Sequence, residues 1–517
     1  MVDSAMDRRS RLDRRSRLGR RSRVETLTRI ARGWTAVGAV VALGWAAGGC
    51  HRTDAGFHPV ESMPLTTDSR EAQRLYHDGL DLLDKQRRSE ASRLFTMATE
   101  RDPEFAMAHW GLAVTHDDYG QRLDALHRAM ALAPAASEAE RWMILGLDAN
   151  FRGAHDEEIE SYRRITEAYP GNERGHYMLG EAYRLVGAHE DAVASFERAL
   201  ALAPEWPQVH NLLGYTQKAL GRFDEAKETF ERYIALMPTE ANPYDSYAEL
   251  LMKMGRFEAS IESYDEALAR KADFHQSHIG KAHCLMLLGR GDEARATLEA
   301  LRKISTPKTQ RDAWQWIVHS YLFEGDHAGA LADAGKMLAA DRSAGDLQGE
   351  ALALMSIARI QLERGDLPAV EVSLREISEL LVGAPKATAG WLRTLHLQGR
   401  LAVAAGELER AGQVVTQLQG LTEQAQSGTF EQAVAELQGL IALARDDWAA
   451  ALDAFEGMDT GSPRTHYLIA LAHRGAGNAE ELHTAATRAA HFNGMHIDYP
   501  YVRRGALALL ETDGHDT

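Results

Sequence analysis

The chain has 517 residues, of which 45% are apolar, and a net charge of −17. This apolar content is ordinary for a protein with a buried core. Residues 1–32 contain eleven Arg and four acidic residues, which leaves a charge of −24 on residues 33–517. A body this acidic argues against nucleic acid, whose phosphates need a basic surface, and against anionic lipid headgroups.

Residues 1–49 are predicted to be a targeting segment. Their basic stretch is followed by seventeen uncharged residues, Gly33 to Gly49, and then by Cys50. This order resembles a bacterial lipoprotein signal, and the resemblance implies that Cys50 is acylated and becomes the mature N-terminus. An uncleaved membrane anchor and an ordinary cleaved signal are alternatives, although the apolar run is short for a membrane helix, which needs about 20 residues. We therefore expect an exported protein of the bacterial cell envelope, tethered to a membrane by lipid.

Residues 50–70 are polar, contain Gly56, Pro59 and Pro64, and predict a flexible tether. If Cys50 carries lipid, Cys284 has no partner, so we expect no internal disulfide.

The strongest pattern in the chain is a step of 34 residues. Three kinds of residue share this step, namely turn glycines, large apolar residues and prolines: Gly153, Gly187, Gly221, Gly255 and Gly289; Tyr162, Phe196, Phe230, Tyr264 and Leu298; Pro170, Pro204 and Pro238. Self-similarity at this period predicts a stack of repeated units, each of which needs its neighbours to bury its apolar face.

The clearest unit, residues 173–204, resembles the tetratricopeptide repeat. The resemblance rests on its pattern of small, aromatic and proline residues: Leu179, Gly180, Tyr183, Ala192, Phe196, Ala199 and Pro204. Small residues let two antiparallel helices approach closely, Phe196 fills the space between pairs, and Pro204 ends the second helix. Gly187 can adopt the left-handed conformation that ends the first helix.

The pattern predicts an all-α fold, and the resemblance implies a right-handed α-solenoid of about twelve helix-turn-helix repeats. About seven regular repeats are expected over residues 71–305. About five degenerate repeats are expected over residues 306–493, and a capping helix and tail over 494–517. The turns of the degenerate repeats are predicted at Gly325, Gly365, Gly406, Asp446 and Gly477.

The resemblance also implies that the first helix of each pair lines an inner groove that binds a peptide or helix of another protein. Mapping the inward positions onto three repeats predicts these groove residues: Arg174, Tyr177, Glu181, Arg184, Gln208, Asn211, Tyr215, Lys218, Asn242, Asp245, Glu249 and Met252. One subfamily holds a C-terminal carboxylate through Lys, Asn and Arg at set positions. Only Asn242 matches it here, so that clamp is not expected.

Two groups of residues have the composition of a metal site. The first is His275, His278, His283 and Cys284, and the second is His109, His116, Asp117 and Asp118. His and Cys are zinc ligands, but the spacing of the first group does not place all its members on one helical face. The chain also lacks the phosphate-loop, His-Glu-x-x-His and Gly-x-Ser-x-Gly motifs.

We therefore predict a non-enzymatic scaffold without cofactor or metal that binds other proteins. Two alternatives are a metal-dependent enzyme built on the histidine groups and a structural array that assembles with copies of itself.

Overall fold

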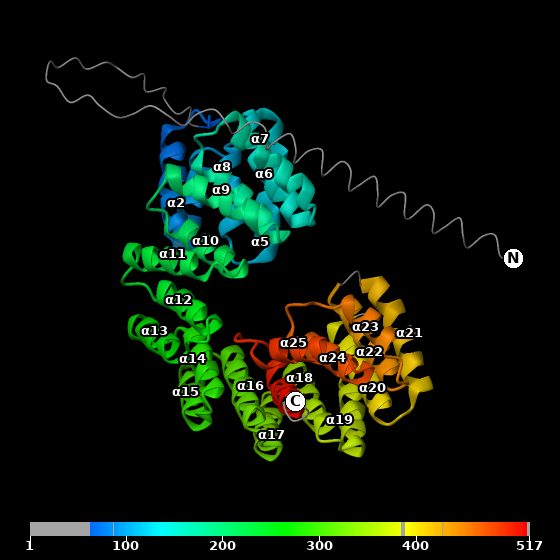
Figure 1. Ribbon diagram of the computed structural model, residues 1–517. Coiled ribbons are helices and arrows are strands. Elements are labelled where there is room, and N and C mark those ends of the chain that lie inside the picture. Colours follow the sequence, from blue (N-terminus) through cyan, green and yellow to red (C-terminus); the bar gives the residue numbers. More distant parts are fainter. Residues whose placement is uncertain (1–62, 86, 384–387, 426–427, 514–517) are drawn as a thin grey trace, which may run out of the picture. The chain divides into compact units, whose positions relative to one another are not determined.

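Consecutive helices joined by short turns form the folded part of the chain (Figure 1). The computed structural model describes residues 63–85, 87–383, 388–425 and 428–513. The predicted targeting segment, Cys50 and most of the predicted tether lie outside these residues. Within the described ranges there are twenty-five α-helices, one 3-10 turn and no strand. None of these helices has both the length and the apolar content needed to cross a membrane.

The helices follow one another as twelve pairs and a final single helix. The first seven pairs are α2 (Arg70–Asp84) and α3 (Arg88–Arg101), α4 (Ala106–Thr115) and α5 (Tyr119–Leu132), α6 (Glu138–Arg152) and α7 (His155–Ala168), α8 (Glu173–Leu185) and α9 (His189–Leu202), α10 (Pro207–Ala219) and α11 (Phe223–Leu236), α12 (Ala241–Lys253) and α13 (Phe257–Arg270), and α14 (His275–Leu287) and α15 (Gly291–Ile304). The 3-10 turn η1 (Ala133–Ala135) follows α5.

The remaining five pairs have longer helices on average. They are α16 (Pro307–Glu324) and α17 (His327–Ala344), α18 (Leu347–Glu363) and α19 (Leu367–Leu380), α20 (Ala389–Ala404) and α21 (Leu408–Ala425), α22 (Gly428–Leu443) and α23 (Trp448–Glu456), and α24 (Pro463–Ala476) and α25 (Ala479–Ala490). The last helix is α26 (Tyr499–Asp513).

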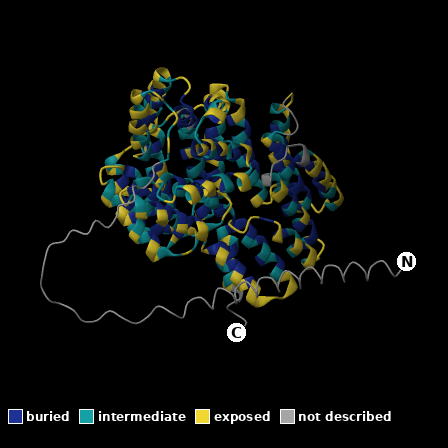
Figure 2. Cartoon of the chain, turned by 90° about the horizontal axis from the view of Figure 1, so that it is seen from above, coloured by how far each residue is buried: buried dark blue, intermediate teal, exposed yellow. Residues whose placement is uncertain are grey.

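Each helix packs against the next one in the chain, and first helices of successive pairs also touch each other, as α2 does with α4, α12 with α14 and α20 with α22. Buried residues lie where helices face one another, and exposed residues lie on their outer sides (Figure 2). The all-α fold of stacked helix pairs predicted from the 34-residue step is therefore confirmed.

The predicted turns contain residues in the left-handed conformation. The five glycines from Gly153 to Gly289 have φ between 69° and 74°. In the second half, Gly325, Gly365, Gly406 and Gly477 have φ between 73° and 76°, and Asp446 has φ 58°. A helix commonly ends on such a residue because it lets the chain turn back while the last carbonyls keep their hydrogen bonds.

Glycine inside the first helix makes room for an aromatic ring of the second. A Cβ atom added to Gly180 would lie 2.6 Å from Cε1 of Phe196. Gly214 and Phe230 repeat this contact at 2.7 Å. The rings themselves are fully buried. The small residue therefore sets the distance between the two helices of a pair.

Replacement of Gly180 by leucine is expected to lower the free energy of unfolding by about 1–3 kcal/mol, because the new side chain would collide with Phe196. Urea unfolding followed by circular dichroism measures the change. Gly412 provides the control, since it lies inside α21 with no neighbouring atom within 4 Å of an added Cβ. Gly412→Ala should raise the stability by about 0.5–1 kcal/mol through better helix propensity. Equal stability of Gly180→Leu and the parent chain would contradict the packing argument.

The C-terminal segment contacts helices far away in the sequence. Helix α26 packs against α24 and α25 and also against α16. Nη1 of Arg504 donates to the carbonyl oxygen of Glu324 at 2.7 Å. Before α26, Nζ of Lys253 donates to the carbonyl oxygen of Phe492 at 3.4 Å. The end of the chain is thus joined to its middle.

Candidate functional site

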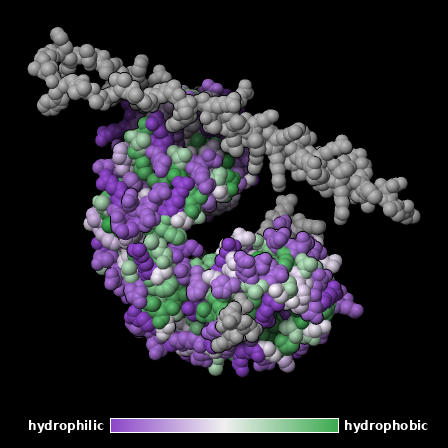
Figure 3. All heavy atoms as spheres, in the orientation of Figure 1, coloured by the Kyte–Doolittle hydropathy of each residue, from purple (hydrophilic) through white to green (hydrophobic). Residues whose placement is uncertain are grey.

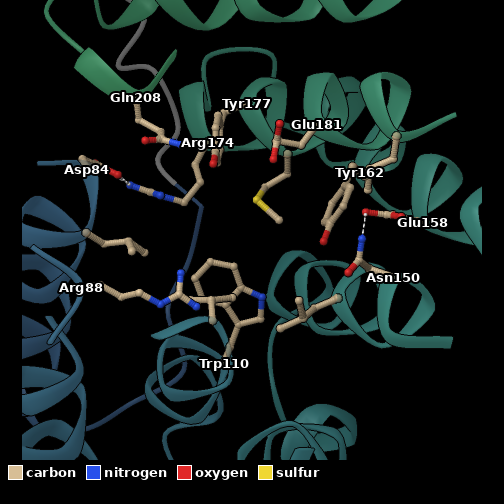
Figure 4. Close-up of a pocket in the computed structure, with 15 residues that line it drawn as sticks. Asp84, Arg88, Trp110, Asn150, Glu158, Tyr162, Arg174, Tyr177, Glu181 and Gln208 are labelled. Carbon is tan, nitrogen blue, oxygen red and sulfur yellow. Dashed lines mark hydrogen bonds and ion pairs between the residues drawn. The ribbon is translucent and has the colours of Figure 1, made fainter. Parts of the chain in front are cut away.

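A pocket of about 440 Å³ lies among α2, α3, α4, α6, α7, α8 and α10. Four predicted groove residues line it: Arg174, Tyr177, Glu181 and Gln208. Six further polar or aromatic residues complete the lining that Figure 4 labels: Asp84, Arg88, Trp110, Asn150, Glu158 and Tyr162. The pocket therefore draws its side chains from several consecutive pairs.

Arg174 and Tyr177 are held in fixed positions at one side of this pocket. Nη2 of Arg174 donates to both carboxylate oxygens of Asp84, at 2.9 and 2.7 Å. The guanidinium of Arg174 lies 4.9 Å from the centre of the Trp206 ring. The centres of the Tyr177 and Trp206 rings are 5.0 Å apart. Burial raises the pKa of Asp84, with Arg174 opposing the rise. These contacts fix the side chains before any ligand arrives.

Trp110 and Tyr162 each bring a buried polar atom to the pocket. Trp110 is 1% exposed and Tyr162 is fully buried. Neither Nε1 of Trp110 nor the hydroxyl of Tyr162 has a hydrogen-bond partner within the described part of the chain. Burial raises the pKa of Tyr162 well above its usual value, so its hydroxyl stays protonated. Buried polar groups are normally paired, so both side chains offer a donor that a bound acceptor would satisfy.

The carboxylates of the pocket have partners of their own. Nδ2 of Asn150 donates to Oε1 of Glu158 at 3.0 Å, and Nδ1 of His155 lies 3.1 Å from Oε2. Nε of Arg184 donates to Oε1 of Glu181 at 2.9 Å. In Figure 4, Asp84 faces Arg174 on one side of the pocket, and Asn150 bonds Glu158 on another. The arrangement offers aromatic surface and unpaired donors, which suits the backbone carbonyls of a peptide.

The other predicted groove residues mostly bond between helices. Oγ of Ser246 donates to Oδ1 of Asn211 at 3.0 Å and accepts from the hydroxyl of Tyr215 at 3.2 Å. Nζ of Lys218 lies 3.0 Å from Oε2 of Glu249. Nδ2 of Asn242 donates to the hydroxyl of Tyr233 at 2.9 Å. These bonds link neighbouring pairs.

Two predicted groove residues are interior. Asp245 is 4% exposed, and its Oδ1 accepts from Oγ of Ser277 at 2.6 Å. Burial raises the pKa of Asp245 to about 7. Met252 is also 4% exposed and belongs to a core cluster with Tyr264 and Cys284. Both residues support the stack from inside.

The first histidine group has three separate environments. Nε2 of His275 lies 3.8 Å from Oδ2 of Asp312. His283 is fully buried, with its ring 5.6 Å from Trp316 and 5.5 Å from Phe323. Sγ of Cys284 lies 3.3 Å from Oγ of Ser260. Burial raises the pKa of the Cys284 thiol to about 11.

The second group is also divided. His116 ends α4, and Oδ1 of Asp118 caps α5 by accepting from the backbone N–H of Gln121 at 2.9 Å. His109 and His278 instead share a recurring role. Side chains at this position in five first helices bond a carbonyl six residues earlier: His109 to Pro103, His176 to Pro170, His210 to Pro204, Tyr244 to Pro238 and His278 to Ala272, at 3.0, 3.1, 2.9, 3.2 and 2.9 Å. Across the described ranges, no three His, Cys, Asp or Glu residues come together as a metal site.

Sequence reasoning missed Trp110 and Tyr162 as site residues, because it assigned both to the repeat framework. The 34-residue spacing of His176, His210, Tyr244 and His278 was a signal for the recurring side chain–carbonyl bond.

Comparison with known proteins identifies the repeats. Tetratricopeptide repeat family models match residues 78–121, 183–250 and 251–307. No curated protein matches the chain.

Solved structures with similar folds cover only part of the chain. A MamA protein is 22% identical and covers 32% of this chain and 91% of its own, with a TM-score of 0.30. A tetratricopeptide repeat protein from Parabacteroides merdae ATCC 43184 is 15% identical and covers 52% and 92%, with a TM-score of 0.32. PilW, a type IV pilus biogenesis factor, is 18% identical and covers 39% and 92%, with a TM-score of 0.34. The family models show that this chain carries tetratricopeptide repeats over residues 78–121 and 183–307.

Proposed function

We propose that the chain is a non-enzymatic scaffold that binds a segment of another protein in the pocket of α2 to α10. Tetratricopeptide repeats commonly serve as protein-interaction scaffolds, and the pocket supplies a site of suitable chemistry. The observation that carries the proposal is the pair of buried, unpartnered donors, Nε1 of Trp110 and the hydroxyl of Tyr162. A peptide carbonyl can accept from either, and the Tyr177 ring adds apolar contact area.

One face of the molecule is mostly polar. The face seen in Figure 3 is largely hydrophilic, with smaller areas of hydrophobic residues.

Photo-crosslinking of the full chain in its native host tests the proposal. A photoreactive amino acid at Gln208, which lines the pocket, is expected to capture a discrete protein. The same group at Val372, which is 51% exposed and does not line the pocket, should not capture it. Equal labelling from both positions, or no specific product from Gln208, would refute binding in this pocket.

Tyr162→Phe in the crosslinking chain should reduce capture severalfold, because one hydrogen bond contributes about 1 kcal/mol. Tyr264→Phe is the matched control. Tyr264 is 1% exposed and also has an unpartnered hydroxyl, but it does not line the pocket. Both variants remove only a hydroxyl group, so a selective effect of Tyr162→Phe isolates the pocket donor. Equal effects of the two variants would argue against a contact through Tyr162.

We further propose that the protein is exported and anchored to a bacterial membrane by lipid on Cys50. The basic stretch, the uncharged run and the cysteine that follows it support this part of the proposal. Metabolic labelling with a radioactive fatty acid should mark the parent chain and leave Cys50→Ser unlabelled. The unlabelled variant should also leave the membrane fraction if its signal is still cleaved. Label retained by Cys50→Ser would exclude this attachment site.

A further inference from the structure

A second pocket, of about 460 Å³, lies in the second half of the chain. First helices α16, α18, α20, α22 and α24 line it together with Met337 of α17, the start of α26 and a few residues between helices. It shares no residue with the pocket of α2 to α10, so the inference below is independent of the proposed function. Its most distinctive feature is a set of five lining arginines: Arg311, Arg359, Arg393, Arg400 and Arg464.

Four of these arginines are held by carboxylates, and Arg311 pairs with both Asp341 and Asp346. Nε and Nη2 of Arg464 donate to Oε1 of Glu436 at 2.9 and 2.6 Å. Nη2 of Arg400 donates to Oε1 of Glu363 at 2.9 Å. Nη2 of Arg359 donates to Oδ1 of Asp498 at 2.5 Å. A guanidinium has five N–H donors, and these bonds use only one or two of each.

Several buried atoms of lining residues lack partners within the described ranges. They include Nε of Arg359, Nδ1 of His319 and Oγ1 of Thr465. His319 is 2% exposed and Thr465 is fully buried. Nε2 of His319 faces Nε2 of Gln315 at 3.0 Å, and Oε1 of Gln315 accepts from Oγ of Ser356. With the Gln315 amide as the donor in this contact, the proton of neutral His319 resides on Nδ1.

The unpaired donors can be satisfied by a hydrogen-bond acceptor on a ligand. The charged residues around them determine how much negative charge that ligand can carry. Asp312, Glu436 and Asp498 line the same pocket as the arginines. Four of the five lining arginines pair with carboxylates within the described ranges, including Arg311 with Asp341 and Asp346, so the charge of Arg393 remains to balance one negative charge on a ligand. Arginine also matches the planar geometry of a carboxylate through paired hydrogen bonds.

Part of the pocket wall is apolar. This part includes Leu352, Met355, Leu397 and Phe430. Ile497 also lines the pocket and is 59% exposed. Apolar walls with a few convergent polar groups are typical of small-ligand sites, and the volume falls within their usual range. The ligand thus needs an apolar part beside its acceptor group.

We propose that this pocket binds an amphipathic monocarboxylate. Its carboxylate oxygens accept from the free donors of Arg359, His319 and Thr465, and its apolar part lies against the aliphatic and aromatic side chains. A free fatty acid and the C-terminal residue of a peptide both carry this chemistry.

Isothermal titration of the full chain tests the proposal with three probes. They are octanoate, neutral octanamide, and a short peptide that ends in a free leucine carboxylate. At least one acid is expected to bind with one-to-one stoichiometry, and octanamide at least about tenfold more weakly. Tighter binding of octanoate identifies a free acid as the ligand, and tighter binding of the peptide identifies a chain terminus. No saturable binding of either acid, or equal binding of octanamide, would overturn the proposal.

Variants locate the binding in this pocket. Thr465→Val keeps the side-chain shape and removes an unpartnered hydroxyl, so the chain should still fold. Arg393→Gln removes an exposed guanidinium that lines the pocket. Each should weaken binding of the acid about 3- to 10-fold. Thr394→Val is the matched control, since Oγ1 of Thr394 bonds the Gly390 carbonyl and its side chain does not line the pocket. Unchanged affinity in both test variants, with both folded by circular dichroism, would refute the site.

Discussion

Replacement of Glu436 by alanine is expected to lower the free energy of unfolding by about 3–5 kcal/mol, because it removes the only carboxylate that contacts Arg464 among the described residues. Glu436 is 5% exposed and Arg464 is 8% exposed. Nε of Arg400 also lies 3.8 Å from Oε1 of Glu436. Burial by itself would raise the pKa of Glu436, but Arg464, His396 and Arg400 hold it well below its usual value. Urea unfolding at pH 7.5 measures the loss.

Two controls separate charge burial from simple truncation. Glu160 pairs with Arg163 and Arg164 at the surface, and its side chain is 45% exposed. Glu160→Ala should change the stability by no more than about 1 kcal/mol, because exposed pairs contribute little. The double variant Glu436→Met with Arg464→Met should recover part of the loss, since it removes both charges of the pair. A loss from Glu436→Ala as small as that from Glu160→Ala would contradict the buried-cluster argument.

Stability is expected to fall between pH 6.5 and pH 4, because two buried histidines resist protonation in the folded chain. Burial lowers the pKa of His283 to about 4, and burial together with Arg359 lowers the pKa of His319 to about 3. The unfolded chain binds protons below about pH 6.5 while the folded chain does not. The stability that these two histidines contribute is therefore fully present above pH 6.5. Each histidine contributes a loss of up to about 1.4 kcal/mol per pH unit as the pH falls. Asp245, whose pKa burial raises to about 7, takes up a proton in the folded chain over the same range and offsets about one of the two histidines.

Urea midpoints measured at intervals from pH 7.5 to pH 4.5 check this prediction. His283→Phe should flatten the slope, because the phenyl ring can pack against Trp316, Phe323 and Tyr499 without titrating. Partial burial also lowers the pKa of His109, His176, His210, His275 and His466, so some slope should remain. Exposed His483 provides the control, and His483→Gln should leave the slope unchanged. A midpoint that does not move with pH would contradict the prediction.

The fold was predictable because each repeat depends on local chemistry. A turn between antiparallel helices needs a residue that accepts positive φ, and glycine does so with little strain. Gly187 and Gly325 therefore marked turns correctly although only the first belongs to the strict 34-residue step. The turn predicted at Asp446 also has positive φ, at 58°, although its residue is not glycine.

The sites were harder to predict because they depend on contacts across repeats. Tyr177 lines the first pocket as an inward position should, but Asp245, at another such position, is buried beneath Ser277 of the next pair. How closely neighbouring first helices approach decides between these outcomes, and the repeat pattern does not specify that distance. The arginines of the second pocket come from repeats without a common step. Nothing in their spacing indicated that Arg359 and Asp498 would meet.

The attachment of α26 to α16 changes how the second half of the chain should respond to load. In an open stack each pair meets only its neighbours, so the last pair can fray alone. Here, peeling away the C-terminal segment also breaks the bond between Arg504 and Glu324 and uncovers Tyr499, which packs against Phe323. A pull on the C-terminus is therefore carried directly to the middle of the chain. Helices α16 to α26 should therefore unfold cooperatively as one unit, instead of one pair after another.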